Sequence, residues 1–311
     1  MTNRVHVPFD ERWRMQTEPR VSQAVRIGGF SAICGQCDLD SRGRPLHAGE
    51  LWPQVEAVTR HLFRRLQQAG APAASVRRLE AFYVGPANEH ELRAALVDAV
   101  GSQADVLLVP LSYFYYPGMR IELDAICDAD NRLVFRTADG DDIDTALTAL
   151  NVPPDSIRLL RMYRRGRSGS TTDAIPLPEL PCPVRVAAIA TDVPPPDIIF
   201  VGGRLPVDER GEVQHRDDVE AQTRFVMSCV ERELRKHDAS LADLAKVTVH
   251  YVGGPAPEEL HRNLDVRSQL YVRPGPASTG VPVPTLQLPG ATILIEAIAV
   301  KGESDPEQGR R

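Results

Sequence analysis

The sequence is poor in aromatic residues and has no long hydrophobic run. Of its 311 residues, 5% are aromatic and 2 are tryptophan. No apolar run approaches the roughly 20 residues that a helix needs to cross a bilayer. The N-terminus is polar and has no signal-peptide pattern. We therefore expect a globular protein without a membrane partner, and 311 residues suffice for two ordinary domains.

Cysteine is also scarce, and its number is odd. The 5 cysteines suggest reduced thiols in a cytoplasmic protein. Cys34 and Cys37 have CxxC spacing, but no second ligand pair accompanies them, and we interpret them as core thiols. The 8 histidines form no metal-binding motif, and no glycine-rich phosphate loop is present. We therefore expect neither a metal nor a cofactor.

Positive charge is not in excess, because the net charge is −6. Nucleic-acid binding needs a basic face, so nucleic acid is not the expected partner. A local exception is the basic segment Arg161–Arg167. We interpret it as a solvated loop, with docking of an acidic partner as the alternative.

What the sequence does contain is an internal duplication. Residues 109–126 align without a gap on residues 281–298, and Pro117–Gly118 meets Pro289–Gly290. Each copy is predicted to be a hairpin of two strands around the Pro-Gly turn. Segments that precede the hairpins also recur in the two copies, and the same number of residues separates each of these pairs. The separation between the two hairpins is four residues longer. This pattern predicts an α/β fold with two ββαβαββ copies, each sheet covered on one face by two helices.

The duplication also sets the expected domain boundaries. Residues 1–20 are polar and are expected to form an irregular arm, and residues 302–311 a flexible tail. The segment between the copies is rich in Gly, Ser, Pro and Arg, which is typical of a linker with short helices. The expected order is an arm (1–20), a first domain (21–130), a linker or insert (131–183), a second domain (184–301) and a tail (302–311).

Two motifs resemble the Rid/YjgF family of reactive-intermediate deaminases, which act on imines and enamines. Ser22-Gln-Ala-Val-Arg and Cys34-Gly-Gln resemble the family's "YSQAV…SGQ" signature. The endings at 121–126 and 293–298 resemble its "IEIEAIA" strand. The resemblance implies a chorismate-mutase-like fold that assembles as a homotrimer around a sheet barrel. A tandem chain could form such a trimer, or its own two halves could form part of the ring. Ligand sites would lie in clefts between neighbouring units.

The resemblance also implies site residues, and the chain departs from several of them. The family's "PARS" arginine, which holds a substrate carboxylate, is replaced by Ser278 in Pro276–Thr279. The strand glutamate that positions water is present as Glu122 in the first copy but is Leu294 in the second. The pocket asparagine is matched by Asn263. The chain thus resembles a tandem member of this family that lacks the usual arginine.

Each candidate residue has a structural alternative. Glu122 could take a raised pKa beside a cleft, or be a surface glutamate. Ser278 and Thr279 could offer hydroxyls to an anion, or form a plain turn. Arg204 could replace the missing arginine, or be solvated, and Tyr115 belongs to an aromatic run expected at a pocket or an interface. The candidate catalytic residues are Glu122, Ser278 and Thr279, and the candidate binding residues are Arg204, Cys34, Gln36, Tyr115, Asn263 and Gly280.

Two classes of function fit these observations. The first is a hydrolase or deaminase acting on an imine, enamine or related conjugated carboxylate in a specialised metabolic pathway. The second is a non-catalytic ligand-binding or assembly protein, which the missing arginine favours. A third hypothesis, a vinyl-ether hydrolase similar to the chorismatases, lacks matching motifs. The expected partner is a small-molecule carboxylate, and the substrate itself is not predicted.

Overall fold

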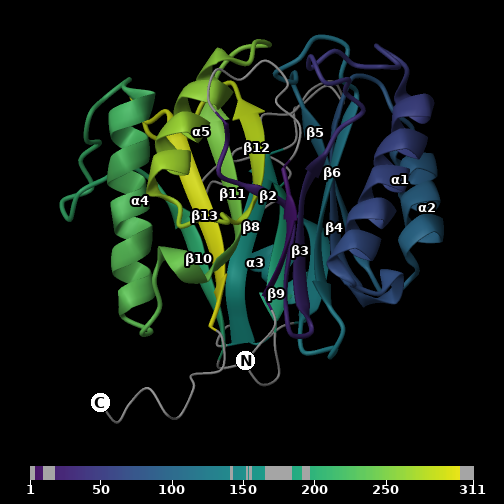
Figure 1. Cartoon of the computed structure of the whole chain (residues 1–311), viewed down its shortest axis with the longest axis horizontal. Coiled ribbons are helices and arrows are strands. Elements are labelled where there is room, and N and C mark those ends of the chain that lie inside the picture. Colours follow the sequence, from purple (N-terminus) through teal and green to yellow (C-terminus); the bar gives the residue numbers. More distant parts are fainter. Residues whose placement is uncertain are drawn as a thin grey trace.

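The structure is a computed structural model that describes residues 4–9, 18–140, 143–151, 153, 156–164, 184–190 and 197–301. Within these ranges the chain forms one ten-stranded sheet and a separate three-stranded sheet. Helices α1 and α2 flank the large sheet on one side and α4 and α5 on the other (Figure 1). No helix in the described part is both long and apolar enough to cross a membrane.

The large sheet combines two similar sets of strands and helices. The first set is β2 (Ser22–Ile27), β3 (Phe30–Gln36), α1 (Leu51–Ala69), β4 (Val76–Val84), α2 (Glu89–Val100), β5 (Asp105–Leu111) and β6 (Ile121–Asp128). The second set is β10 (Ile198–Arg204), α4 (Val219–Arg235), β11 (Leu244–Val252), α5 (Glu258–Leu270), β12 (Ala277–Val283) and β13 (Ile293–Val300). We call these sets the first and second repeats.

The two repeats have the same order of elements and the same pairing. In the first repeat the strand order is β3-β6-β4-β5, and in the second it is β10-β13-β11-β12. Along the sequence, the same number of residues separates the start of β3 from that of β10 and the start of β4 from that of β11. The separation between β6 and β13 is four residues longer. The α/β fold predicted from the duplicated sequence is therefore present. The second copy differs in one element, because its leading strand β9 (Val184–Ala190) lies in the three-stranded sheet.

The predicted hairpins are wrong. β5 and β6 do not pair with each other, because β4 lies between them, parallel to β5 and antiparallel to β6. In the second repeat β11 separates β12 from β13 in the same way. The Pro-Gly turns therefore belong to connections that cross over a neighbouring strand. The aromatic run at 113–116 accordingly lies in the loop between β5 and β6 rather than on a strand.

The segment expected to be a linker with short helices contains strands. It provides β7 (Val134–Gly140), α3 (Ile143–Leu150) and β8 (Ile157–Arg164), and β9 pairs between β7 and β8. β7 contacts β5, and β8 contacts β10. The small sheet therefore spans between the two edge strands of the large one. Residues 165–183, with the end of the basic segment, lie outside the described residues, as does the expected tail.

The expected irregular arm at the N-terminus also contains a strand. β1 (Arg4–Pro8) pairs antiparallel with β2, and Arg4 pairs with Ile27 in the register. The guanidinium of Arg4 donates to the carbonyl of Asp243 in the second repeat at 2.8 Å. The arm thus connects the two repeats.

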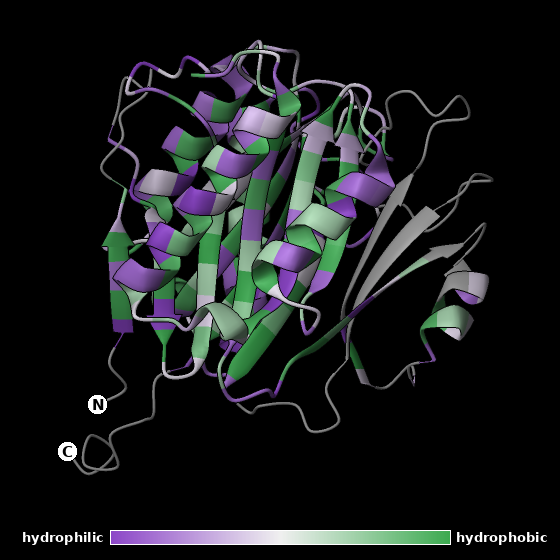
Figure 2. Cartoon of the chain, turned by 90° about the vertical axis from the view of Figure 1, so that its right-hand side faces the viewer, coloured by the Kyte–Doolittle hydropathy of each residue, from purple (hydrophilic) through white to green (hydrophobic). Residues whose placement is uncertain are grey.

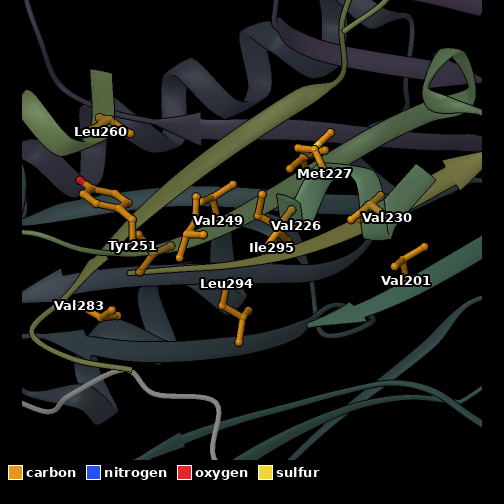
Figure 3. Packing of buried hydrophobic residues seen from close by; sticks show 14 of the residues in the cluster. Val201, Val226, Met227, Val230, Val249, Tyr251, Leu260, Val283, Leu294 and Ile295 are labelled. Atoms are coloured by element: carbon orange, nitrogen blue, oxygen red, sulfur yellow. The ribbon is translucent and has the colours of Figure 1, made fainter. Parts of the chain in front are cut away.

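Each repeat buries an apolar core between its helices and one face of the sheet. In the second repeat, Val226, Met227 and Val230 of α4 gather above Val249 and Ile295 (Figure 3). Alternate residues on these strands face the helices, and their neighbours face the opposite, inner surface of the curved sheet. Viewed from the side of α1 and α2, hydrophobic residues follow the strands behind the helices (Figure 2).

A buried glutamine in each repeat links the first long helix to the Pro-Gly turn. Gln54 Nε2 donates to the carbonyl of Gly118 at 2.8 Å, and Gln222 Nε2 donates to that of Gly290 at 2.7 Å. Gln222 Oε1 accepts from the Thr292 amide at 2.7 Å. The equivalent contacts show that the duplication extends to side-chain hydrogen bonds.

Substitution Gln222→Leu is expected to destabilise the protein by about 1–3 kcal/mol, because several backbone groups lose their partner while the volume is kept. Urea unfolding of wild type and variant measures this difference. Gln67→Leu, on the exposed side of α1, is the control and should change stability by less than about 0.5 kcal/mol. Equal effects of the two substitutions would contradict the assigned role.

Candidate functional site at the junction of the repeats

The two repeats meet where β12 lies beside β2 and β3. β12 pairs with β2 at Ala277 and Ser22, and the Ser22 amide donates to the carbonyl of Pro276 at 2.9 Å. Beyond this point the Gly35 amide of β3 donates to Thr279 Oγ1 of β12 at 3.0 Å. Side chains from both repeats therefore converge on this junction.

Glu122 lies on the first repeat's side of the junction. It is 3% exposed, and its carboxyl lies over Gly35, where an added Cβ would come within 1.6 Å of Glu122 Oε1. The Tyr115 hydroxyl donates to Glu122 Oε2 at 3.2 Å and lies 3.2 Å from Cys37 Sγ. Burial, followed by the charge of Asp124, raises the pKa of Glu122 to about 8. The carboxyl is therefore mostly neutral at pH 7 and can donate a proton.

The equivalent position in the second repeat is apolar. Leu294 lies over Gly203, where an added Cβ would be 3.1 Å from Leu294 Cδ2. Leu294 is 2% exposed and belongs to the main core cluster. The carboxyl group thus occurs in one repeat, and its counterpart has become part of the core.

Arg267 of α5 lies on the second repeat's side of the junction. It is 1% exposed, and its Nη1 donates to Ser278 Oγ at 2.8 Å and to the Tyr271 hydroxyl at 3.1 Å. Its Nε and Nη2 donate to Asn263 Oδ1 at 3.2 and 2.8 Å. All these acceptors are neutral, and within the described ranges no carboxylate forms an ion pair with Arg267. Among the residues that the structure describes, this guanidinium is a buried cation without a counter-anion.

Tyr251, at the end of β11, lies between these groups. Burial and then the charge of Glu122 raise its pKa well above the usual value, while the charge of Arg267 acts in the opposite direction. The phenol therefore lies close enough to Glu122 and Arg267 for both charges to affect its pKa. Its ring packs beside Leu260 (Figure 3). Its hydroxyl oxygen is buried and has no hydrogen-bond partner in the described part of the chain, which is unusual for a buried polar group.

The two predicted hydroxyls lie on opposite faces of β12. Ser278 faces α5 and accepts from Arg267. Thr279 pairs in register with Thr248, so its side chain points to the inner surface. There it accepts a hydrogen bond from Lys246 Nζ, which also donates to Asp124 Oδ2 at 2.8 Å. The junction therefore presents one hydroxyl on each side of the strand.

Two of the other predicted binding residues lie around this junction. Asn263 holds Arg267 through its side-chain oxygen. Gly280 adjoins Leu260 and Tyr251, and an added Cβ would come within 2.5 Å of Leu260 Cδ1. Both positions thus shape the surroundings of the guanidinium.

Cys34 and Gln36 form a buried hydrogen-bonded group on β3. Gln36 Nε2 donates to the oxygen of Gln23 at 3.2 Å, and Cys34 Sγ lies 3.3 Å from the same oxygen. Cys34 belongs to a buried apolar cluster that also contains Ala277 and Ile298 of the second repeat. No group of three or more His, Cys, Asp or Glu residues in the described part could hold a metal ion.

Arg204 is placed elsewhere. Its guanidinium pairs with Glu233 of α4 at 3.2 Å, and its side chain is 43% exposed. It therefore lies on the side of β10 and α4, and Arg267 is the arginine that reaches Ser278. The signal for Arg267 was present in the sequence, because Asn263, Arg267 and Tyr271 recur at four-residue spacing, which places them on one face of a helix.

The aromatic run joins the two repeats. The Tyr113 hydroxyl donates to the carbonyl of Gly253. The Tyr116 hydroxyl lies 3.2 Å from Nε2 of His261 on α5. Phe114, Tyr115 and Tyr116 are buried in the core cluster that also contains Tyr251. The run thus encloses the junction from the side of the first repeat.

Comparison with known proteins gives a consistent assignment. The family model for endoribonuclease L-PSP matches residues 186–301. A RutC family protein of Pyrococcus abyssi is 33% identical over 106 residues, which is 34% of this chain and 80% of that protein. The chain belongs to this family, which is also called Rid or YjgF.

Solved structures of family members are similar in part. A YjgF/YER057c/UK114 family member from Mycobacterium tuberculosis is 21% identical, with a TM-score of 0.34 over 40% of this chain and 99% of that one. A Rid family protein from Yersinia pestis is 24% identical, with a TM-score of 0.32 over 36% of this chain and 84% of that one. RidA from the Antarctic bacterium Psychrobacter is 23% identical, with a TM-score of 0.31 over 34% and 81% of the two chains.

Proposed function

We propose that the chain hydrolyses a small imine or enamine carboxylate at the junction of its two repeats. Arg267 binds the carboxylate at the side facing α5. Glu122 acts as the acid and base from the other side, and Tyr251 donates a hydrogen bond between them. The site is then made by one chain, with the acid from the first repeat and the anion-binding group from the second.

The observation that carries this proposal is the buried, unpaired guanidinium of Arg267. Burying a cation without an anion is costly, so such a group points to an anionic ligand. In the described part of the chain, four hydrogen bonds to Asn263, Tyr271 and Ser278 leave one N–H of Nη2 without an acceptor. A planar guanidinium is well suited to a carboxylate. Arg267 therefore takes the role of the missing "PARS" arginine from another element.

The chemistry follows from the neutral state of Glu122. A neutral carboxyl can donate a proton to the substrate nitrogen, which makes the C=N carbon more electrophilic. The resulting carboxylate then accepts a proton from the attacking water. The water oxygen bonds to the carbon and gives a tetrahedral adduct with one hydroxyl and one amino group. Glu122 then returns its proton to the nitrogen and accepts the hydroxyl proton, the C–N bond breaks, and ammonia leaves together with a 2-oxo acid.

The test is turnover of 2-aminoacrylate generated in situ. Wild type is expected to release pyruvate and ammonia, with a kcat that falls above about pH 8 as Glu122 loses its proton. Glu122→Ala should lower kcat by about 100-fold or more. Glu56→Ala, on the exposed side of α1, should leave kcat unchanged. Equal rates for wild type and Glu122→Ala would remove Glu122 from the mechanism, and no turnover by wild type would remove the deaminase proposal.

A ligand-binding protein without catalysis is the alternative, and the same unpaired arginine favours it. Binding of a small carboxylate without turnover would identify this case. The homotrimer implied by the family and the cytoplasmic location remain predictions. Light scattering on the purified chain measures the first of these.

A further inference from the structure

Two buried side chains adjoin Glu122, and the proposed mechanism gives neither of them a role. Tyr115, in the loop between β5 and β6, is 2% exposed, and Cys37, directly after β3, is 8% exposed. The Tyr115 hydroxyl donates to Glu122 Oε2 at 3.2 Å and lies 3.2 Å from Cys37 Sγ. Because the phenol proton is directed to the carboxyl, the phenol oxygen can accept the proton of the thiol. We call Cys37, Tyr115 and Glu122 the Glu122 cluster.

The second repeat has the same fold without this cluster. Its counterparts of the three residues are two leucines and an amide, at Leu205, Leu294 and Gln287. The leucines pack in or against the main core cluster. The buried Oε1 of Gln287 has no hydrogen-bond partner in the described part of the chain. The members of the cluster come from three separate segments, and all three are replaced, so the fold of a repeat does not require them. This difference indicates a role in the chemistry of the first repeat.

The hydrogen bond from Tyr115 determines which oxygen of Glu122 carries the acid proton. A neutral carboxyl has a hydroxyl oxygen and a carbonyl oxygen, and the carbonyl oxygen is the stronger acceptor. Since Oε2 accepts from Tyr115, Oε2 is the carbonyl oxygen and the proton lies on Oε1. Oε1 is the atom that lies over Gly35, whose amide donates to Thr279 of β12. The acid proton is therefore on the side of Glu122 that faces the junction.

We propose that Tyr115 is a positioning residue that directs the acid proton of Glu122 to Oε1, at the junction with β12, and that Cys37 holds the Tyr115 hydroxyl in this orientation. This inference rests on the proposed function, because it takes Glu122 as the acid. Without the phenol hydroxyl, either oxygen of Glu122 can carry the proton, and only part of the molecules present it to the substrate. The rate of the chemical step then falls, whereas substrate binding is unchanged.

The charges around Glu122 give this proposal a sign that can be measured. The ionisable groups that interact with Glu122 are Asp124, Lys246, Cys37, Tyr115 and Tyr251. Burial, followed by the charge of Asp124, raises the pKa of Glu122, whereas the hydrogen bond from Tyr115 lowers it. Burial also raises the pKa of Tyr115 itself, so the phenol keeps its proton and remains a donor. Removing the hydroxyl should thus raise the pKa of Glu122 further. If Glu122 instead donated to Tyr115, the same removal would lower it.

Four substitutions separate positioning from packing. Tyr115→Phe removes the hydroxyl and keeps the ring. Cys37→Ala removes the thiol, and Cys37→Ser retains a donor at that place. The matched control is Tyr83→Phe, because the hydroxyl of the buried Tyr83 also donates to a glutamate, Glu89 of α2. Circular dichroism verifies that each variant is folded.

Infrared difference spectroscopy in D2O at pH 6 observes the acid without any substrate. The spectrum of wild type minus that of Glu122→Gln should contain the C=O stretch of a neutral carboxyl, at higher frequency than the amide bands. With Glu122→Gln as the reference in each background, Tyr115→Phe should shift this band to higher frequency, because the carbonyl oxygen loses its donor. Cys37→Ala should give both the shifted and the original band. Cys37→Ser and Tyr83→Phe should keep the wild-type band.

Turnover of 2-aminoacrylate is measured in parallel from pH 6 to pH 9. Tyr115→Phe should lower kcat by about 10-fold at unchanged KM and move the alkaline fall of kcat to higher pH. Tyr83→Phe should keep the wild-type kcat and pH profile.

Three results would overturn the inference. These are wild type without the carboxyl band, a band that Tyr115→Phe leaves in place, and an alkaline fall that moves to lower pH in Tyr115→Phe. A wild-type band in Cys37→Ala, or a shifted band in Tyr83→Phe, would overturn it as well. Turnover by wild type with an unmoved band in Tyr115→Phe refutes the inference alone. A shifted band without turnover by wild type refutes the enzymatic function alone.

Discussion

Glu122→Gln is expected to make the protein relatively more stable as the pH rises. The pKa of Glu122 is raised from 4.5 to about 8 in the folded chain. Below pH 4.5 the carboxyl is neutral in both states and costs no stability. Between pH 4.5 and 8 the unfolded chain releases the proton while the folded chain keeps it, so stability falls with roughly 1 kcal/mol per pH unit. Glutamine has no proton to release, so the stability of the variant does not fall for this reason as the pH rises.

Urea unfolding of wild type and Glu122→Gln at pH 5 and pH 9 measures the effect. The stability difference between the two proteins should shift in favour of the variant by several kcal/mol between these pH values. Glu56→Gln, which removes an exposed carboxylate on α1, should give a difference that hardly changes with pH. Parallel pH profiles for wild type and Glu122→Gln would show that the Glu122 pKa is not raised.

Lys246→Met is expected to be the most destabilising single substitution at the junction. It leaves the Asp124 carboxylate, 2% exposed, without its cation at 2.8 Å. Breaking a buried ion pair by removing one partner typically costs about 3–5 kcal/mol. The Ile33 carbonyl and Thr279 also lose a hydrogen-bond donor. The midpoint of urea unfolding should fall accordingly.

The second half of this prediction concerns the pair. Asp124→Asn in the Lys246→Met background should recover most of the lost stability, since the buried charge is then gone. A surface lysine, Lys236, provides the control, and Lys236→Met should cost less than about 1 kcal/mol although it also breaks an ion pair. If Lys246→Met cost no more than Lys236→Met, the buried ion pair would not contribute to the stability of the junction.

The sequence predicts the repeated fold well, because duplicated residues keep their spacing. The Pro-Gly turns and the glutamines at 54 and 222 occupy equivalent places. The strand partners were harder to predict. A turn between two strands suggests a hairpin, but the insertion of β4 between β5 and β6 depends on contacts far apart in the chain. The strands of the insert were missed because its Pro and Gly content resembled that of a linker.

The candidate site was predicted in part, for similar reasons. Glu122 is a local match to a family motif, whereas Ser278 and Thr279 stand where the chain departs from one. These three residues lie near the junction of the repeats. Arg267 was missed because it comes from α5 rather than from the strand where the family has its arginine. Lys246 was missed although the polar residues Lys246, Thr248 and His250 alternate along an apolar strand. This alternation indicates a polar inner face, but which groups meet there depends on the packing of the two repeats.

The most direct test of the site is titration of wild type, Arg267→Lys and Arg267→Met with pyruvate at pH 7. If Arg267 is the anion-binding group, wild type binds pyruvate and Arg267→Met loses about 10-fold or more in affinity. Arg267→Lys should be intermediate, because it keeps the charge without the planar fork. Circular dichroism verifies that each variant is folded. Wild-type affinity in folded Arg267→Met would contradict the assignment of the junction as a carboxylate site.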